Sequence, residues 1–430
     1  MADRARIAHL LRRATFGPTA EEVDDAERAG YDATVRRLVD ARGVDAEPPV
    51  FAAVAAGDSR EERQRAMKER REQVTAAIEW WLDRMVTAED QLAEKMVFFW
   101  HGHWATSAQK VKTASLMLGQ LETFREYGRG EFTAFVTRMV RDPALILWLD
   151  GQKNTVKAPN ENLARELMEL FTLGIGNYTE DDVKAGARAL TGWTVDRRAG
   201  TVRFAPRRHD EGTKTILGRT AAFDADGLAA LVAAQPAGAA FLAERLWFRF
   251  ASGEPIAAEV RDRLAAAFAA RRDVDAALRA MFTDQAFAGT RGQLVKQPVE
   301  WAVGALRQLG IRPARLTDQQ RKQLLSGLNG LDQVPLRPPS VGGWPAGAAW
   351  LTTSSLQARV RLAELLAARA APAVVERLKA APTAGRPDAL ARLLVVDVWT
   401  DRTRSVLAEA AAKPERLLQL GLVSPEYTVH

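Results

Sequence analysis

Cysteine is absent from this 430-residue sequence, and the chain has only five histidines and four tyrosines. Without cysteine the chain can form no disulfide, no thiolate metal site and no cysteine nucleophile. No stretch reaches the roughly 18–20 uninterrupted apolar residues that a membrane span needs. The first residues also lack the apolar core and the small-residue cleavage site of a secretory signal. We therefore expect a cytoplasmic protein without a transmembrane segment.

Three common catalytic motifs are missing as well. The sequence contains no Gly-x-x-x-x-Gly-Lys loop, no Gly-x-Ser-x-Gly elbow and no His-Glu-x-x-His helix. These motifs cradle phosphates, expose a serine nucleophile and hold zinc, respectively. Their absence excludes the common nucleotide-binding, serine hydrolase and zinc protease templates.

Charged residues are abundant but mixed in sign. The net charge is +6, and the arginines are interleaved with acidic residues, as in Arg60-Glu61-Glu62-Arg63. Opposite charges at helical spacing are typical of a solvated helix face. Because no basic stripe alternates with exposed aromatic residues, no nucleic-acid partner is expected.

Apolar residues make up 47% of the chain, and their spacing of three and four predicts a mainly all-α, multi-helix fold. A long charged helix is predicted over residues 59–88. Strands are favoured only near 192–218, where 192–195 and 201–204 fit a β-hairpin that 215–217 is expected to join. We predict one elaborated helical domain over residues 1–430. Because the composition shifts near 220 toward alanine-rich helices, a motif-bearing lobe 1–220 and a second lobe 221–430 form an alternative division.

A helix predicted over residues 160–174 has two interpretations. Asn160 suits its N-cap, and its apolar residues share one broad face. Glu161, Arg165 and Glu169 align at i,i+4 on the other face, as in a surface salt ladder. Glu166 falls at the edge of the apolar face, where burial would raise its pKa and suit an acid–base residue or metal ligand. The second interpretation makes Glu166 and Glu169 catalytic candidates, with Asn160 and Arg165 as binding candidates.

Two of the five histidines stand in the segment Trp100-His101-Gly102-His103-Trp104. Histidines at i,i+2 point the same way only on an extended backbone, and Gly102 offers a local break. His101 and His103 are therefore candidate ligands of a divalent metal, the one cofactor that the sequence indicates. In the alternative interpretation both are structural residues that are hydrogen-bonded among aromatic rings.

Two loops supply the remaining candidates. His209 and Asp210 follow the predicted hairpin in a segment of loop character, where functional residues gather, and are candidate catalytic residues. The Pro/Gly-rich loop 334–347 is accompanied by Trp344 and Trp350, which would form an aromatic binding platform if exposed. In the alternative interpretation these tryptophans anchor the helical core.

These motifs resemble, in order and over nearly the whole chain, the bacterial domain-of-unknown-function family 1800. The resemblance is carried by residues 9–17, 99–104, 160–174, 178–183, 187–193, 209–210, 296–300, 342–345 and 424–427. The sequence departs from the family in having Gly102 and Trp104 where relatives have asparagine and phenylalanine. The resemblance implies an envelope- or polymer-related role and a partner encoded nearby with sulfatase-like features. Many relatives are exported, and the lack of a signal peptide sets this sequence apart from them.

The sequence leaves three functional hypotheses open. The favoured one is an enzyme, a metal-assisted hydrolase or transferase, whose site is formed by the convergence of His101, His103, Glu166, Glu169, His209 and Asp210. The second is a glycan- or peptide-binding assembly protein that uses the tryptophan-containing loop. The third is a structural helical scaffold whose polar motifs serve only to satisfy buried groups.

Overall fold

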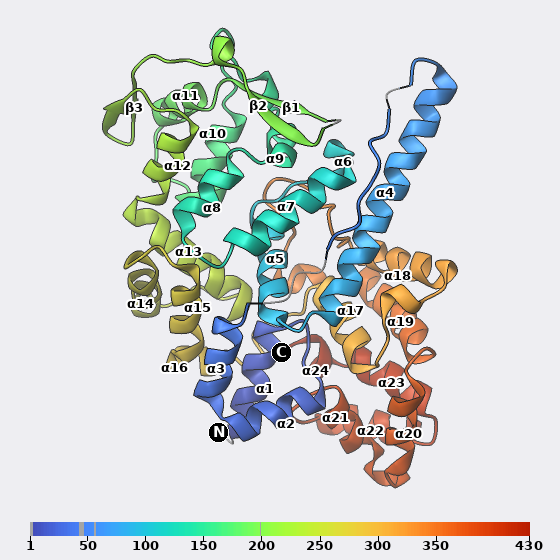
Figure 1. Cartoon of the computed structure of the whole chain (residues 1–430). Helices are drawn as coiled ribbons and strands as arrows, with labels where there is room; N and C mark the ends of the chain where they lie inside the picture. Colours follow the sequence, from blue (N-terminus) through green and yellow to red (C-terminus); the bar gives the residue numbers. More distant parts are fainter. Residues whose placement is uncertain (1–2, 43–46, 56, 198) are drawn as a thin grey trace.

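Helices account for 64% of the described residues, whose named strands form two short hairpins. The computed structural model describes residues 3–42, 47–55, 57–197 and 199–430 (Figure 1). The predicted all-α class with a small inserted hairpin is confirmed.

Side-chain caps begin several helices of the first half of the chain. Thr19, Ser59 and Thr179 each accept a hydrogen bond from the backbone N–H three residues later, and each is part of a reciprocal capping box. Such caps satisfy amides that have no partner inside the helix. The helices and turns of this half are α1 (Asp3–Ala14), α2 (Ala20–Ala29), α3 (Tyr31–Asp40), α4 (Arg60–Thr87), α5 (Gln91–His103), α6 (Ala108–Val111), α7 (Ala114–Tyr127), α8 (Phe132–Met139), α9 (Pro143–Trp148), η1 (Gly151–Lys153), α10 (Asn162–Glu166), η2 (Leu167–Thr172), α11 (Glu180–Ala189) and η3 (Pro206–Arg208).

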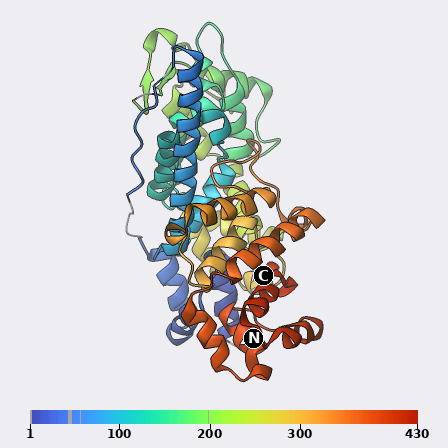
Figure 2. The ribbon, with the colours of Figure 1, turned by 90° about the vertical axis from the view of Figure 1, so that its right-hand side faces the viewer.

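The long helix α4 changes character along its length. From Val74 onward it buries a continuous face that includes Ile78, Trp81 and Met85, whereas its first turns are largely exposed. The exposed turns extend away from the neighbouring helices in Figure 1, and Figure 2 shows α4 in front of the other elements. The charged half of the sequence pattern therefore corresponds to a solvated extension, and only the apolar half joins the core.

The strands form two separate hairpins. β1 (Trp193–Asp196) pairs antiparallel with β2 (Thr201–Phe204), with Trp193 opposite Phe204. β3 (Lys214–Ile216) pairs instead with β4 (Arg219–Ala221). The expectation that residues 215–217 join the first hairpin was wrong, because Leu217 and Gly218 both adopt positive φ and close a tight two-residue turn.

The second half of the chain packs back onto the first. Arg12 of α1 forms an ion pair with Asp397 at 2.9 Å, and Tyr31 of α3 donates a hydrogen bond to the Phe282 carbonyl at 2.7 Å. The elements of this half are α12 (Ala225–Ala233), α13 (Pro236–Phe250), α14 (Ala258–Ala269), α15 (Val274–Thr283), α16 (Gln285–Ala288), α17 (Pro298–Gln308), η4 (Pro313–Arg315), α18 (Asp318–Gly330), η5 (Gly347–Trp350), α19 (Thr353–Ala367), α20 (Pro372–Ala380), η6 (Thr383–Gly385), α21 (Arg386–Leu393), α22 (Asp401–Ala410), α23 (Pro414–Val423) and α24 (Pro425–Thr428).

Across the described residues, no single helix combines the length and the apolar composition of a membrane span. The pair α12 and α13 meets both conditions only when the two helices are joined, and they are bent by 71°.

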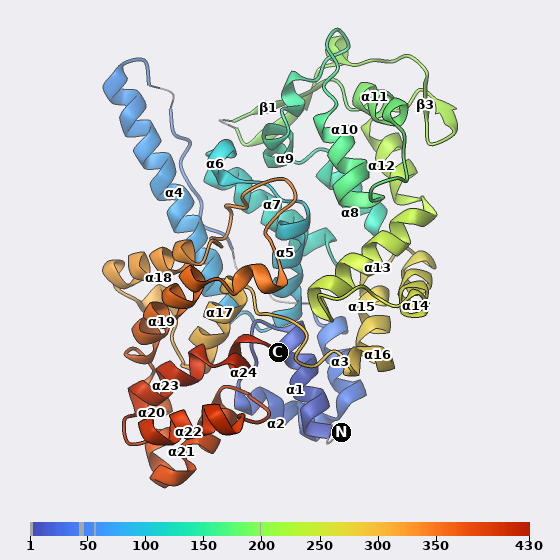
Figure 3. The ribbon, with the colours of Figure 1, turned by 180° about the vertical axis from the view of Figure 1, so that it is seen from behind.

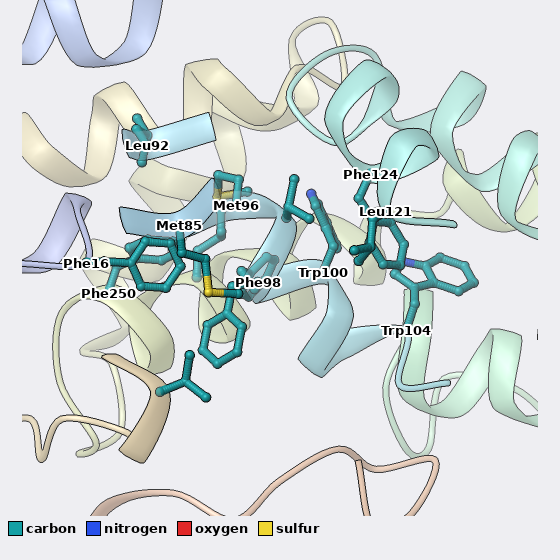
Figure 4. Close-up of a cluster of buried hydrophobic side chains, with 14 of the residues drawn as sticks. Phe16, Met85, Leu92, Met96, Phe98, Trp100, Trp104, Leu121, Phe124 and Phe250 are labelled. Atoms are coloured by element: carbon teal, nitrogen blue, oxygen red, sulfur yellow. The ribbon is translucent and has the colours of Figure 1, made fainter. Parts of the chain in front are cut away.

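Helix α5 occupies the centre of the structure, with the loop 334–347 crossing beside it (Figure 3). Its aromatic side chains are buried from Phe98 to His103. Figure 4 shows Phe98 and Trp100 among core side chains that include Phe16 and Phe124. Burying each aromatic side chain stabilises the fold by about 1.5–3 kcal/mol, so the carboxyl-terminal end of α5 is held rigidly.

Candidate functional site

The two histidines of α5 have different partners. The helix continues through Gly102 to His103, so the local break that would align both rings does not occur. His101 Nε2 accepts a hydrogen bond from the Leu336 N–H at 3.0 Å. His103 Nε2 lies 2.9 Å from the Phe171 carbonyl; because a carbonyl only accepts, this nitrogen carries the proton. The Nδ1 atom of His103 is then a buried acceptor without a partner in the described residues.

Both imidazoles are uncharged at neutral pH. Burial lowers the pKa of His101 to about 3. Burial, together with the charge of Arg245, lowers the pKa of His103 to about 3. An imidazole that stays neutral can accept a proton or a hydrogen bond but does not supply a fixed positive charge.

This arrangement gives no support to a shared metal at His101 and His103. Among the residues that the structure describes, no group of three or more histidine or carboxylate side chains could hold a metal ion. The Nε2 lone pair of His101 is also occupied by the Leu336 amide. A divalent metal therefore stays a prediction.

The predicted helix over 160–174 is two elements. Asn160 Oδ1 accepts a hydrogen bond from the Asn162 N–H at 3.1 Å, and α10 begins at Asn162. Residues Leu167–Thr172 then form a π-helix, η2. π-Turns are uncommon and often occur at functional sites. The wider turn breaks the 3.6-residue period from which the faces of this helix were predicted.

Because of this wider turn, Arg165 and Glu169 do not pair with each other and contact different partners. Arg165 forms ion pairs with Glu161 at 3.1 Å and with Glu180 of α11 at 2.7 Å. Glu169 instead accepts a hydrogen bond from the Tyr178 hydroxyl at 2.5 Å. Burial, and then the charge of Glu169, raise the pKa of Glu166 above its usual range. The two neighbouring carboxyls thus have unequal environments.

A pocket of about 460 Å³ lies between the end of α5, η2, α13 and the loop 334–347. Its polar wall contains His103, Glu169, Asn177, Glu244 and Arg245. His103 and Glu169 are thus the two sequence-predicted site residues that line it, while His101, Glu166, His209 and Asp210 are not among its lining residues. The pocket can present a carboxylate, a neutral imidazole and a guanidinium to one bound group.

The arginines of α13 were missed by the sequence analysis. Arg245 lines this pocket, and Arg249 lines a smaller adjoining cavity of about 140 Å³. The sequence did contain a signal, because the two arginines stand at i,i+4 in a mostly apolar helix segment, FLAERLWFRF, whose other charged residue is Glu244. Residues at that spacing share one side of a helix.

Comparison with known protein families matches residues 9–429 to the family described as "Protein of unknown function (DUF1800)". The chain belongs to the DUF1800 family. The match confirms the resemblance that the sequence motifs indicated. Comparison of this DUF1800 protein with curated proteins and with solved structures found no match in either set.

In this DUF1800 protein, His209 and Asp210 have partners within the hairpin region. Asp210 Oδ2 accepts a hydrogen bond from Arg188 Nε at 2.7 Å, which lowers the pKa of Asp210. His209 Nδ1 lies 3.0 Å from the Thr191 carbonyl. These contacts join the segment to α11, and a catalytic role for either residue stays a prediction.

The two tryptophans of the loop region are buried in the DUF1800 protein. Trp344 is 8% exposed and Trp350 is 2% exposed, so neither offers a free ring face to a glycan or peptide. The Trp344 ring instead packs edge-on against His101, with 5.3 Å between the ring centroids. Their burial gives no support to an exposed aromatic platform.

The loop 334–347 docks on α5 through a close backbone approach. Gly343 has φ of +81°, and a Cβ atom there would lie 2.3 Å from the Gly102 carbonyl oxygen. Only glycine fits both the conformation and the space. Two neighbours of Gly343, Gly342 and Trp344, line the adjoining cavity, so this contact sets one wall of the site.

Gly343→Ala is expected to destabilise the protein by about 2–4 kcal/mol, because backbone strain adds to the clash with Gly102. Urea unfolding measures the loss, and limited proteolysis reports whether the loop 334–347 detaches. Gly347→Ala is the matched control, since Gly347 also has positive φ (+61°) but a Cβ atom there meets nothing within 4 Å. The control variant is destabilised only by the backbone strain, which costs about 1–2 kcal/mol. Equal losses in both variants would show that the Gly102 contact contributes nothing.

Proposed function

We propose that this protein is a hydrolase or transferase whose reaction takes place in the pocket between η2 and α13. The observation that carries the proposal is the carboxylate of Glu169, placed by a π-turn on the wall of a pocket that it shares with His103 and Arg245. Acid–base enzymes need a positioned carboxyl or imidazole within reach of the reacting group. The implied envelope- or polymer-related role of the family agrees with hydrolysis or transfer on such a substrate.

Glu169 is the proposed general base. Burial and the hydrogen bond to Glu169 raise the pKa of Tyr178 to about 12, so the hydroxyl remains a donor that orients the carboxylate. Glu169 would take a proton from a water or a substrate hydroxyl, which then attacks the bond to be cleaved. Glu166 does not line the pocket, and its raised pKa lowers the repulsion between the two carboxyls at mildly acidic pH.

The other two groups would act on the substrate without exchanging protons with Glu169. His103 lines the pocket, and its buried Nδ1 acceptor has no partner in the described residues; we assign it the role of binding a substrate hydroxyl and fixing its orientation. Arg245 is a cation on the same wall and would stabilise negative charge that develops as the leaving group departs.

The test compares turnover of four model substrates by the wild-type protein and by Glu169→Gln. The substrates are p-nitrophenyl acetate, p-nitrophenyl phosphate, p-nitrophenyl sulfate and p-nitrophenyl β-glucoside. Each is assayed with and without Mg²⁺ and Zn²⁺, because the metal is still a prediction. We expect wild-type turnover of at least one class, and a loss of about 10²–10⁴-fold in Glu169→Gln. Glu161→Gln is the matched control, since Glu161 pairs with Arg165 at 3.1 Å outside the pocket.

The two variants make the result decisive. Activity that survives in Glu169→Gln, with Glu161→Gln also active, would assign turnover to another site. Equal loss in both variants would indicate a structural effect of the α10–η2 segment. No turnover of any class under any condition would count against an enzyme and favour the scaffold hypothesis.

A further inference from the structure

A second, smaller cavity adjoins the proposed catalytic pocket. Its volume is about 140 Å³, and it shares His103, Arg245 and Gly342 with the larger pocket. The rest of its wall is formed by Phe99, Gly102, Phe248, Arg249, Trp344 and Ala346. None of the aspartates and glutamates that the structure describes lines it. The cavity has room for a small ion with a few waters, since a water occupies about 30 Å³.

Two guanidinium groups on its wall lack a direct ion-pair partner among the described residues. Within the part of the chain that the structure describes, neither Arg245 nor Arg249 forms an ion pair, and Arg245 Nε has no hydrogen bond. Burial lowers the pKa of Arg249 only to about 10, so this group is charged at neutral pH. Partly buried arginines without a carboxylate are costly unless an anion compensates them.

The buried charged groups around Arg249 carry an excess of positive charge. The charge of Glu300 acts on Arg249, but Glu300 already forms an ion pair with Lys95 at 2.8 Å. Its charge also acts on Arg13. One carboxylate therefore serves Lys95, Arg249 and Arg13, so positive charge is in excess around Arg249.

Trp344 adds an uncharged hydrogen-bond donor to the cavity wall, and Gly102 leaves space there because glycine has no side chain. Trp344 is 8% exposed, and its Nε1–H has no hydrogen-bond partner in the described residues. A Cβ atom at Gly102 would lie 2.9 Å from Arg249 Nη2, so glycine at this position leaves room for the guanidinium group. Unpaired buried donors are rare in folded proteins, and a bound oxyanion would satisfy these.

We propose that this cavity binds a tetrahedral oxyanion, a sulfate or phosphate group, through Arg245, Arg249 and Trp344. The donors come from two separate elements, α13 and the loop 334–347, and such an arrangement suits a tetrahedral group better than a planar carboxylate. Two guanidiniums and the buried excess of positive charge suit a dianion. The further step, that the oxyanion belongs to the substrate cleaved in the adjoining pocket, rests on the proposed function.

Isothermal titration of the purified protein with inorganic sulfate, inorganic phosphate and acetate tests the site. We expect one equivalent of sulfate or phosphate to bind, and acetate to bind at least about ten-fold more weakly. Arg245→Gln is expected to weaken binding of the dianion by about ten-fold or more. Trp344→Phe keeps the ring in the core and is expected to weaken it by a few-fold, about the contribution of one neutral hydrogen bond.

Arg65→Gln removes the same charge from the exposed part of α4 and serves as the control for net charge. Affinity unchanged in Arg245→Gln, equal losses in Arg245→Gln and Arg65→Gln, or no dianion binding by the wild-type protein would each overturn the inference. Acetate bound as tightly as sulfate would overturn the tetrahedral assignment. The stronger of sulfate and phosphate identifies the group on the ligand.

The two proposals fail separately. If sulfate binding depends on Arg245 while Glu169→Gln leaves turnover unchanged, the anion site stands and the proposed catalytic role of Glu169 fails. If Glu169→Gln abolishes turnover while Arg245→Gln binds the dianion as the wild-type protein does, the catalytic proposal stands and the anion site fails.

Discussion

Glu300→Gln is expected to destabilise the protein by about 3–5 kcal/mol, because it leaves buried cations without their carboxylate. The side chains of Lys95 and Glu300 are 3% and 7% exposed, and their charged atoms lie 2.8 Å apart. Glu300 also accepts a hydrogen bond from the Gln297 N–H at 3.1 Å, at the start of α17. Although burial alone would raise the pKa of Glu300, Lys95 and Arg249 hold it below its usual range.

Urea unfolding at pH 7 measures this effect. Glu376→Gln is the matched control, because Glu376 forms an exposed ion pair with Lys379 at 2.9 Å and such pairs contribute about 0–1 kcal/mol. A loss in Glu300→Gln no larger than in the control would mean that Lys95 and Arg249 lose their charge on folding. That result would also remove the charge excess on which the anion site depends.

Asp142→Asn is expected to abolish a loss of stability that the wild-type protein shows as the pH rises from 5 to 8. Asp142 caps α9 and accepts hydrogen bonds at 2.7 Å from the Leu145 N–H and from Gln120 Nε2. Burial raises the pKa of its carboxyl from 3.8 to about 7. A group whose pKa is raised by folding stabilises the protein at low pH and loses this contribution as the pH rises through the folded value.

The size of this change in stability follows from the shift in the pKa of Asp142. The wild-type protein should lose about 2–3 kcal/mol relative to Asp142→Asn between pH 5 and pH 8. Urea unfolding of both proteins at the two pH values measures it. Asp150→Asn is the control, because the hydrogen bond from Lys110 lowers the pKa of Asp150, so its contribution is constant across this range. A parallel pH dependence of the wild-type protein and Asp142→Asn would contradict the raised pKa.

The sequence predicted the helices of this protein better than the faces that they present. Ser59 begins α4 close to the predicted start of the long charged helix, because capping chemistry is local. Glu169 was predicted to align with Arg165 on a surface ladder, but the π-turn of η2 gives it Tyr178 as its partner. A period of 3.6 residues cannot reveal such a turn, since its cause lies in the packing of distant elements.

The site residues illustrate the same limit. His103 was a candidate from its rarity and its aromatic neighbours, but its partner at Phe171 lies 68 residues away in the sequence. Arg245 and Arg249 were visible as charges in an apolar helix segment. Their significance appears only once neither is found to form an ion pair within the described residues. No local pattern shows that a charge lacks a partner.

The sequence by itself determined the helical class, the capped start of the long charged helix, the first hairpin and membership of the DUF1800 family. Each of these depends on residues that are neighbours in the chain. The tertiary structure alone decided that His103, Glu169 and Arg245 share one pocket and that Arg245, Arg249 and Trp344 share the next. Those residues lie on separate elements, and only the burial of their apolar neighbours brings the elements together.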